Sequence, residues 1–151
     1  MGDLSLESSA FKSGEEIPKK YGYKFENVNS PLKIRNVPKD TKSLAIIMDD
    51  PDAMDAVGKI WVHWVIWNIN PATTEISEGT IIPGTTEGMT DFGEIGYGGP
   101  APPDKRHTYI FKLYALKTKL DLKNGSTKVQ LENAIKNQIL GKTSLQGTFT
   151  P

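Results

Sequence analysis

The side chains best suited to chemistry in this sequence are its two histidines, His63 and His107, which both stand in strand-like aromatic segments. Near neutral pH a histidine can transfer a proton, bind a metal or donate to an anion. Asp50 and Asp52 flank a proline at the end of an apolar run, and Tyr109 lies two residues after His107. Carboxylates, imidazoles and a phenol are sufficient for acid–base catalysis, for a metal site or for a small hydrogen-bonding pocket.

A loop rich in glycine and proline precedes the second histidine. Residues 96–103 read GYGGPAPP and lead toward the strand-like segment that begins at His107. Glycines allow a backbone to approach a bound group closely, and prolines hold a loop open without needing partners for an N–H group. Each feature alone has an ordinary structural explanation, since Asp-Pro-Asp is usually a turn and a strand histidine is usually hydrogen-bonded in the core. Their combination favours a pocket.

Three strand-like segments must position these residues. Residues 43–48, 59–69 and 107–116 are rich in apolar, β-branched and aromatic side chains. The nearly unbroken apolarity of 59–69 predicts a central strand that is covered on both faces. Turn-forming prolines and glycines separate the segments. The pattern predicts a mainly β domain.

One late helix is expected over residues 127–140. Thr127 and Gln130 fit a capping box at its start, and Gly141 is the expected stop. The apolar positions recur at the four-residue spacing of a helix face, at Leu131, Ile135 and Ile139.

Side-chain direction decides which residues of the strands can meet. Successive side chains of a strand alternate between its two faces. Alternation places His63 on the face that carries Trp61, Val65 and Trp67, and it places His107 and Tyr109 together on one face. The two aspartates point the same way if the proline between them keeps the backbone extended.

The composition describes a globular chain of balanced charge. Its 151 residues include 18 basic and 18 acidic side chains, so the formal net charge is zero, which gives no support to nucleic-acid binding. The absence of cysteine excludes disulfides, thiol catalysis and zinc held by cysteine. The first residues lack the pattern of a secretory signal, and no apolar run has membrane-spanning length. We expect a single cytoplasmic domain over residues 1–151, without integral membrane association.

Signatures of common hydrolases are missing from the sequence. It contains no His-Glu-x-x-His, no Gly-x-Ser-x-Gly and no phosphate-binding loop that ends in Gly-Lys-Ser/Thr. We therefore expect no cofactor and no metal. Residue types alone leave open a metal bound by His63, His107 and the aspartates, and they leave open hydrolysis by the same pocket.

Three motifs give the chain a family resemblance. In order along the sequence they are MDDPDA, WVHWVIWNI, and GYGGPAPP followed by HTYIFKLYAL. Together they resemble the phosphatidylethanolamine-binding protein (PEBP) family, in particular its bacterial and archaeal branch, often labelled Raf kinase inhibitor-like. The likeness extends through nearly the whole chain. It implies a large antiparallel sheet packed on a smaller one, with helix near the C-terminus.

The resemblance also implies a small anion-binding pocket and a non-enzymatic role. Expected ligands are a small anion or a phosphorylated head group, and expected protein partners are a serine protease or a kinase that the protein inhibits, as a monomer or homodimer. The alternative is a hydrolase or metal-dependent enzyme that uses the same pocket. Carried over position by position, the ligand-binding residues are Asp50, Asp52, His63, Gly98, Gly99, Pro100, His107 and Tyr109.

An anion in such a pocket needs donors. We expect these to be the two imidazoles, the Tyr109 hydroxyl and the backbone N–H groups of Gly98 and Gly99. The aspartates would repel an anion, so we expect one of them to accept a hydrogen bond from a histidine and to favour its charged form. Anion binding should then weaken as the pH rises through the range in which the histidines lose their protons.

Overall fold

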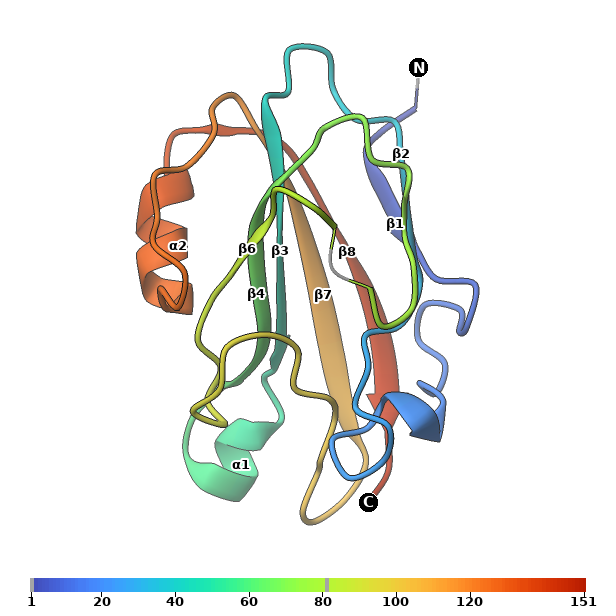
Figure 1. The fold of residues 1–151 in the computed structure, drawn as a ribbon. Helices are drawn as coiled ribbons and strands as arrows, with labels where there is room; N and C mark the ends of the chain where they lie inside the picture. The colour runs from blue at the N-terminus through green and yellow to red at the C-terminus, as the bar shows by residue number, and fades with distance from the viewer. Residues whose placement is uncertain (1, 81) are drawn as a thin grey trace.

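Two antiparallel sheets form the body of the protein, which a computed structural model describes over residues 2–80 and 82–151 (Figure 1). The larger sheet has the strand order β6-β4-β3-β7-β8, and the smaller has the order β1-β2-β5. The strands are β1 (Ser5–Glu7), β2 (Leu32–Arg35), β3 (Ser43–Asp50), β4 (Trp61–Ile69), β5 (Glu75–Ile76), β6 (Thr86–Glu87), β7 (His107–Leu116) and β8 (Ile139–Phe149). The helical elements are α1 (Ala53–Val57), α2 (Lys128–Ile135) and the 3-10 turn η1 (Lys19–Tyr21). The mainly β fold with two sheets and a late helix is confirmed.

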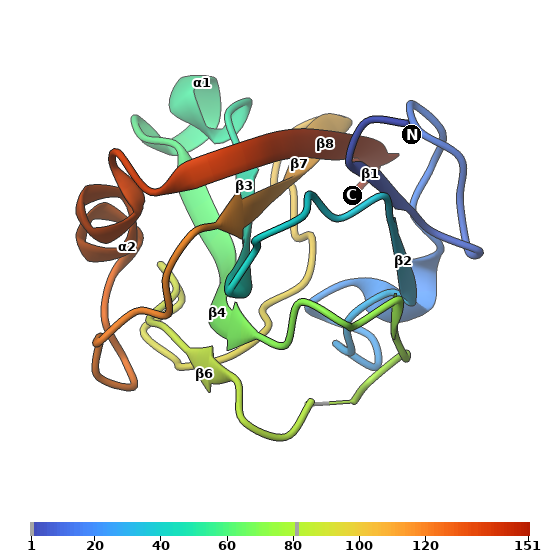
Figure 2. The same cartoon turned by 90° about the horizontal axis from the view of Figure 1, so that it is seen from above.

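The elements form three layers, with the five-stranded sheet between α2 and the smaller sheet (Figure 2). One core cluster fills the space between the two sheets, and it includes Leu6, Ile34, Met48, Trp64 and Phe111. A second cluster lies under α2 and includes Ile47, Val65, Trp67, Leu131 and Ile135. Burying one such side chain contributes about 1.5–3 kcal/mol. None of the helices in the described part of the chain is both long and apolar enough to cross a membrane.

The middle strand of the larger sheet is β3. The sequence had predicted that the strand at 59–69, which is β4, would take the central place. All eight residues of β3 are buried, and it pairs with β4 on one side and β7 on the other. β4 pairs with β3 along most of its length but meets only the two residues of β6 on its outer side. Its apolar run reflects burial on both faces, beneath the smaller sheet and beneath α2, and not a central position.

The late helix begins as predicted. The Thr127 side chain accepts a hydrogen bond from the backbone N–H of Gln130, and the Gln130 side chain accepts one from the backbone N–H of Thr127. Leu131 and Ile135 are buried against the larger sheet. The capping box and the first two members of the apolar face are therefore confirmed.

The predicted end of the helix was wrong. The helix stops at Ile135, Asn137 takes a positive φ of 68°, and Ile139 opens β8 with its side chain 41% exposed. Gly141 lies inside β8 and does not cap a helix. Most β8 side chains are polar or exposed, so this strand has little apolar signal. It forms through backbone pairing with β7 over almost its whole length.

Asp49 and Asp50 leave the end of β3 on opposite faces. Asp49 is buried on the α2 side, where its carboxylate accepts from Lys112 at 2.9 Å and from Lys128 at 2.8 Å. This contact ties the first turn of α2 to the sheet. Asp50 is turned toward the other face, which leaves it available to the site described below.

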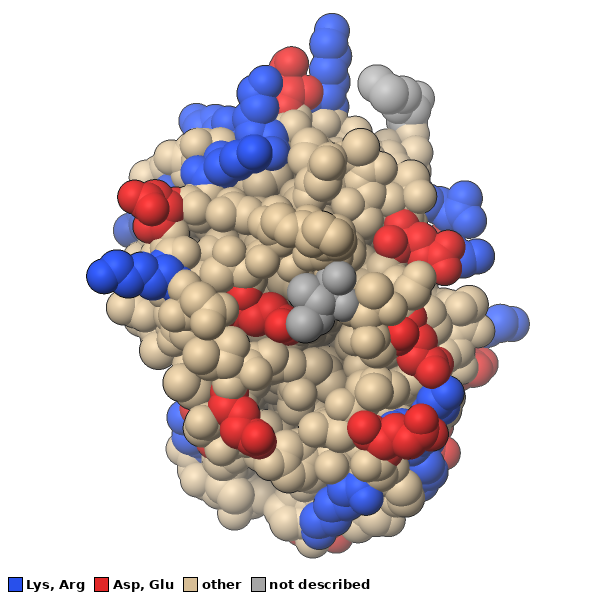
Figure 3. Space-filling model, viewed as in Figure 1, with Lys and Arg blue, Asp and Glu red and all other residues tan. Residues whose placement is uncertain are grey.

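The surface carries both signs of charge. On the face shown in Figure 3, acidic and basic side chains are interspersed, and no area of a single sign dominates it. This agrees with the formal net charge of zero. That face lacks the basic patch that a nucleic-acid-binding surface requires.

Candidate functional site

The end of β3 and the starts of β4 and β7 meet at one end of the molecule, beside α1 and the loop that leads into β7 (Figure 1). A cavity of about 230 Å³ lies there. Its polar lining consists of Asp50, His63 and His107. Its apolar and aromatic lining consists of Ala53, Ala56, Val57, Trp61, Phe92, Ala101 and Pro103. Three of the predicted site residues therefore share one small cavity.

His63 reaches this cavity because of a β-bulge. Met48 pairs with Trp64 and Asp49 pairs with Val62, so His63 is the extra residue of β4 and has no partner on β3. Strict alternation had placed His63 with Trp61, Val65 and Trp67. Trp61 does line the same cavity as His63, but the prediction was wrong for Val65 and Trp67, which lie under α2. An extra residue shifts the alternation by one position. The bulge thus turns His63 toward the cavity.

His63 is a neutral acceptor at physiological pH. Its Nδ1 lies 2.7 Å from the carbonyl oxygen of Gly98, so Nδ1 carries the proton and donates. Nε2 is then an unprotonated acceptor. Burial lowers the pKa of His63 from 6.5 to about 4, although the contact with Gly98 partly opposes this shift. The expectation that both histidines would offer positive charge is corrected for His63.

His107 bridges two carboxylates. Its Nδ1 lies 2.6 Å from Asp50 Oδ2, and its Nε2 lies 2.7 Å from Asp104 Oδ1. Both contacts are satisfied only when each ring nitrogen carries a proton, which is the charged form. Burial opposes that charge, but the hydrogen bonds to Asp50 and then to Asp104 outweigh it, so the pKa of His107 is raised above 6.5. The expected aspartate–histidine contact is confirmed for Asp50.

Tyr109 stands between the two imidazoles, outside the residues that line the cavity, and its hydroxyl forms no well-aligned hydrogen bond. Its ring centroid lies 5.1 Å from that of His63 and 6.4 Å from that of His107. The Tyr109 hydroxyl, Asp50 Oδ1 and Trp61 Nε1 are buried atoms that form no hydrogen bond of good geometry with any described residue. A buried polar group left in this way costs about 1–3 kcal/mol. Burial, and then the nearby Asp50 charge, raises the pKa of Tyr109, so its hydroxyl remains a donor.

Asp52 does not line the cavity but forms a structural hydrogen bond. It adopts helical backbone angles, with φ −71° and ψ −13°, directly before α1. Its Oδ2 accepts from the backbone N–H of Thr108 at 2.8 Å, whereas Asp50 bonds His107. The two aspartates therefore separate because the chain turns after Asp50. Asp52 fixes the start of β7 relative to α1.

The backbone groups of the glycine–proline loop also form hydrogen bonds with other parts of the protein. The N–H of Gly98 donates to a β4 carbonyl at 2.8 Å, and the N–H of Gly99 donates to the Asn27 side chain at 2.7 Å. The Pro100 carbonyl accepts from the N–H of Tyr23. The backbone donors expected for an anion are therefore already occupied. Gly98, Gly99 and Pro100 shape the site without lining it.

Gly99 is required by close packing, and substituting it is expected to disturb the site. A Cβ added there would lie 2.0 Å from the carbonyl oxygen of Tyr21 and 2.8 Å from backbone atoms of its neighbours. Backbone atoms cannot turn aside, so we expect Gly99→Ala to lower the free energy of unfolding by about 1–3 kcal/mol. Gly141→Ala is the matched control, because its Cβ would come no closer than 3.1 Å to another residue, at the side chain of Pro38. Urea unfolding that shows equal losses for both variants would contradict this explanation.

The predicted set of ligand-binding residues lacks three residues of the site. Asp104 contacts His107, and Trp61 and Phe92 form aromatic walls of the cavity. Alternation had placed Trp61 on the face of His63, and Asp104 stands three residues before His107, so both had a signal in the sequence. Phe92 had no such signal, since its edge-to-face contact with His63, at 5.3 Å between centroids, depends on a loop.

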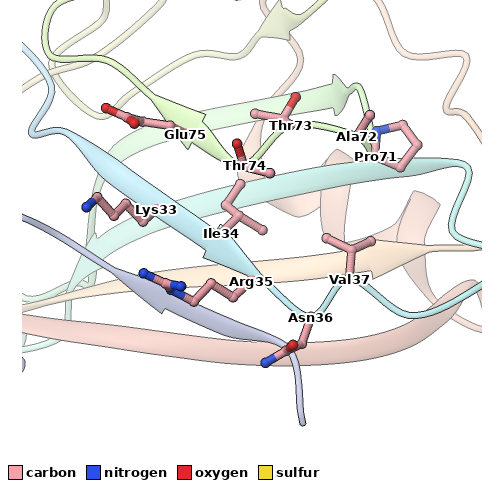
Figure 4. Close-up of a pocket in the computed structure, with 10 residues that line it drawn as sticks. All are labelled: Lys33, Ile34, Arg35, Asn36, Val37, Pro71, Ala72, Thr73, Thr74 and Glu75. Atoms are coloured by element: carbon pink, nitrogen blue, oxygen red, sulfur yellow. The ribbon is translucent and has the colours of Figure 1, made fainter. Parts of the chain in front are cut away.

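A larger hollow of about 510 Å³ lies elsewhere and shares no residue with the cavity (Figure 4). It runs over β2 and β5 and along residues 71–75. Ile34 is its only buried lining residue, and the other lining side chains are half-buried or exposed. It holds no histidine and no buried polar group. The smaller cavity is therefore the candidate site.

The arrangement of acids and histidines does not form a metal centre. Within residues 2–80 and 82–151, no group of three or more histidine, aspartate or glutamate side chains is placed to hold a metal ion. His107 uses both nitrogens on carboxylates, which leaves it no lone pair for a metal while it is charged.

Comparisons with known proteins identify the family of the chain. The family model described as phosphatidylethanolamine-binding protein matches residues 7–150. A UPF0098 protein of Methanothermobacter thermautotrophicus is 41% identical over 151 residues, which cover 97% of this chain and 98% of the relative. The crystal structure of a putative PEBP homologue, CT736 from Chlamydia trachomatis, has a TM-score of 0.92 at 37% identity and covers 98% of this chain and 97% of its own. YbcL of E. coli has a TM-score of 0.90 at 28% identity, with 98% of each chain covered.

A more distant structure shares the fold alone. The carboxypeptidase Y inhibitor, solved with its cognate proteinase, has a TM-score of 0.55 at 18% identity, with 97% of this chain and 82% of its own covered. The family match over nearly the whole length and the relative at 41% identity decide the assignment. This chain belongs to the phosphatidylethanolamine-binding protein family.

Proposed function

We propose that the cavity binds the acidic head of a small ligand, a phosphate or phosphate ester, and that the protein acts as a binding module. The observation that carries this proposal is the charged His107 in the lining of the cavity, held in that form by Asp50 and Asp104. A cationic hydrogen-bond donor suits an oxyanion. The name of the matching family, a binding protein for a phosphate-bearing lipid, supports the same class of ligand.

The acceptors of the cavity add a requirement for a donor on the ligand. Asp50 Oδ1 forms no well-aligned hydrogen bond and His63 Nε2 is unprotonated, so a fully deprotonated anion would face two acceptors. A phosphate that keeps a P–OH group, or a head group that also carries an ammonium, supplies the missing donor. Sulfate supplies none at neutral pH. We therefore expect phosphate and its amine-bearing esters to bind better than sulfate.

The cavity size suits a head group and not a whole lipid. Pockets that enclose drug-sized molecules measure about 300–1,000 Å³, and this one measures about 230 Å³. Its rim is apolar, and Val57 at the rim is 51% exposed. An acidic head can enter while an attached hydrocarbon portion stays outside. A free phosphate ester and a lipid head group present the same chemistry here.

Binding without turnover is favoured by the lining residues. The lining offers no serine, threonine, cysteine or lysine as a nucleophile. The one free imidazole nitrogen belongs to His63, whose pKa of about 4 makes it a weak base at neutral pH. Hydrolysis of a phosphate ester would need a stronger base or a metal.

Inhibition of a serine protease or kinase stays a prediction. The carboxypeptidase Y inhibitor shares the fold at an identity that supports nothing beyond it. Recovery of a protease or kinase on the immobilised protein, followed by an activity assay of the recovered enzyme, would test this role.

Calorimetric titration tests the proposed ligand class. Inorganic phosphate, phosphoethanolamine and sulfate are titrated separately, and vesicles containing phosphatidylethanolamine form an arm that tests a lipid source. We expect phosphate and phosphoethanolamine to bind at neutral pH and sulfate to bind at least about tenfold more weakly, which corresponds to one lost hydrogen bond to a charged group. Binding should persist above pH 6.5, because the pKa of His107 is raised, and should fall at alkaline pH. Equal affinities for phosphate and sulfate would overturn the assigned role of Asp50 and His63.

A further inference from the structure

The two carboxylates on His107 differ in how they are held. Asp50 ends a strand of the larger sheet, and its side chain is 4% exposed. Asp104 lies in the surface loop before β7, and its side chain is 42% exposed. Residues 103–106 are all exposed. One partner of the imidazole is therefore built into the core, while the other approaches from solvent.

The Asp104 carboxylate already accepts a hydrogen bond from the imidazole nitrogen that a ligand would need. His107 Nδ1 points to the buried Asp50, so Nε2–H is the only donor of the imidazole that an incoming anion could use. Asp104 Oδ1 holds that donor at 2.7 Å. The carboxylate thus takes the hydrogen bond that an oxygen of an acidic ligand would need.

We propose that Asp104 is an internal competitor that sets the affinity of the pocket for acidic heads. This inference rests on the proposed function, because it takes the cavity to be an oxyanion site. A ligand displaces the Asp104 carboxylate from Nε2 and forms that hydrogen bond with its own oxygen. The exchange keeps an anion on His107 throughout, so the imidazole stays charged.

Competition by a tethered group has a definite signature. A group held three residues away in the chain acts at a high effective concentration, so it excludes weak anions at ordinary concentrations. The apparent dissociation constant is the intrinsic one divided by the fraction of molecules in which Asp104 has left His107. That fraction is a property of the protein and does not depend on the ligand. Removing Asp104 must therefore increase the affinity for every anion that uses Nε2 by the same factor.

The test compares Asp104→Ala, Asp104→Asn and the unsubstituted protein with two probes, inorganic phosphate and acetate. Alanine removes the competitor, whereas asparagine keeps a neutral acceptor that competes less well. Asp55→Asn on α1 is the charge-matched control, since Asp55 is exposed and outside the cavity lining. Titrations at about pH 6 keep His107 protonated when one carboxylate is removed.

We expect Asp104→Ala to bind phosphate and acetate about tenfold more tightly, by the same factor for both, with Asp104→Asn in between and Asp55→Asn unchanged within about twofold. A gain that Asp55→Asn shares equally would reflect net charge and would overturn the proposal. Unchanged or weaker binding by Asp104→Ala, with phosphate still bound by the unsubstituted protein, would overturn it while the proposed function stands.

Binding by no variant at all would overturn both the competitor and the oxyanion site. Nitrogen NMR of His107 provides the second measurement. In the unsubstituted protein, saturating phosphate should move the Nε2 signal while Nδ1, which stays on Asp50, changes little. Asp104→Ala should move the Nε2 signal before any phosphate is added. If the contact of Asp104 with His107 were purely structural, Asp104→Ala would move the Nε2 signal without any gain in affinity for phosphate. That result would also overturn the proposal.

Discussion

Replacing His107 by alanine is expected to remove phosphate binding and to lower the free energy of unfolding by about 3–5 kcal/mol at neutral pH, because one partner of a buried ion pair is lost. Asp50 is 3% exposed and would keep a charge whose main partner is gone. Burial already raises the pKa of Asp50, with the bond to His107 opposing that rise. Without His107 the carboxyl is expected to take up a proton, and this limits the loss of stability at acid pH.

The double variant Asp50→Asn with His107→Ala separates the two effects. It carries no buried charge at this point, so most of the lost stability should return. Phosphate binding should not return, because the cationic donor is still missing. Urea unfolding measures the first quantity, and calorimetric titration with phosphate measures the second. If the single variant still bound phosphate within about threefold of the unsubstituted protein, His107 would not be the residue that attracts the anion.

The strands that hold the site could be predicted because their signals are local. The segment 107–116 matches β7 throughout, and 43–48 lies within β3, since apolar and β-branched residues crowd both. β8 gave no such signal, because its exposed polar residues gain their place from pairing with β7. A pairing partner distant in sequence is invisible to a window of neighbouring residues.

The chemistry of the site could be predicted only in part. Residue types identified Asp50, His63 and His107, which line one cavity. Their roles required the fold, because a bulge turns His63 inward and burial keeps it neutral. The backbone N–H groups of Gly98 and Gly99 illustrate the opposite error. They look like free donors in a sequence, yet the tertiary structure has already satisfied them.

The buried, neutral His63 should make the protein sensitive to acid between about pH 6.5 and pH 4. The pKa of His63 is 6.5 in the unfolded chain and about 4 in the folded protein, where burial disfavours the charge. Between these values the unfolded chain binds a proton that the folded protein does not, so stability falls as the pH falls. A difference of this size corresponds to about 3 kcal/mol. His107 does not share this window, because its folded pKa is raised and its effect on stability lies above pH 6.5.

His63→Asn isolates this contribution. An asparagine amide can still donate to the Gly98 carbonyl in place of Nδ1, but it does not titrate. The variant should be less stable at pH 7, because it loses the ring that packs on Tyr109 and Phe92. Between pH 6.5 and pH 4, however, its free energy of unfolding should fall by about 3 kcal/mol less than that of the unsubstituted protein. Urea unfolding at several pH values measures both curves, and the subtraction cancels the titration of Asp50 and the other carboxyls. Parallel curves would show that His63 keeps an ordinary pKa in the fold, and its assignment as a neutral acceptor in the cavity would then be wrong.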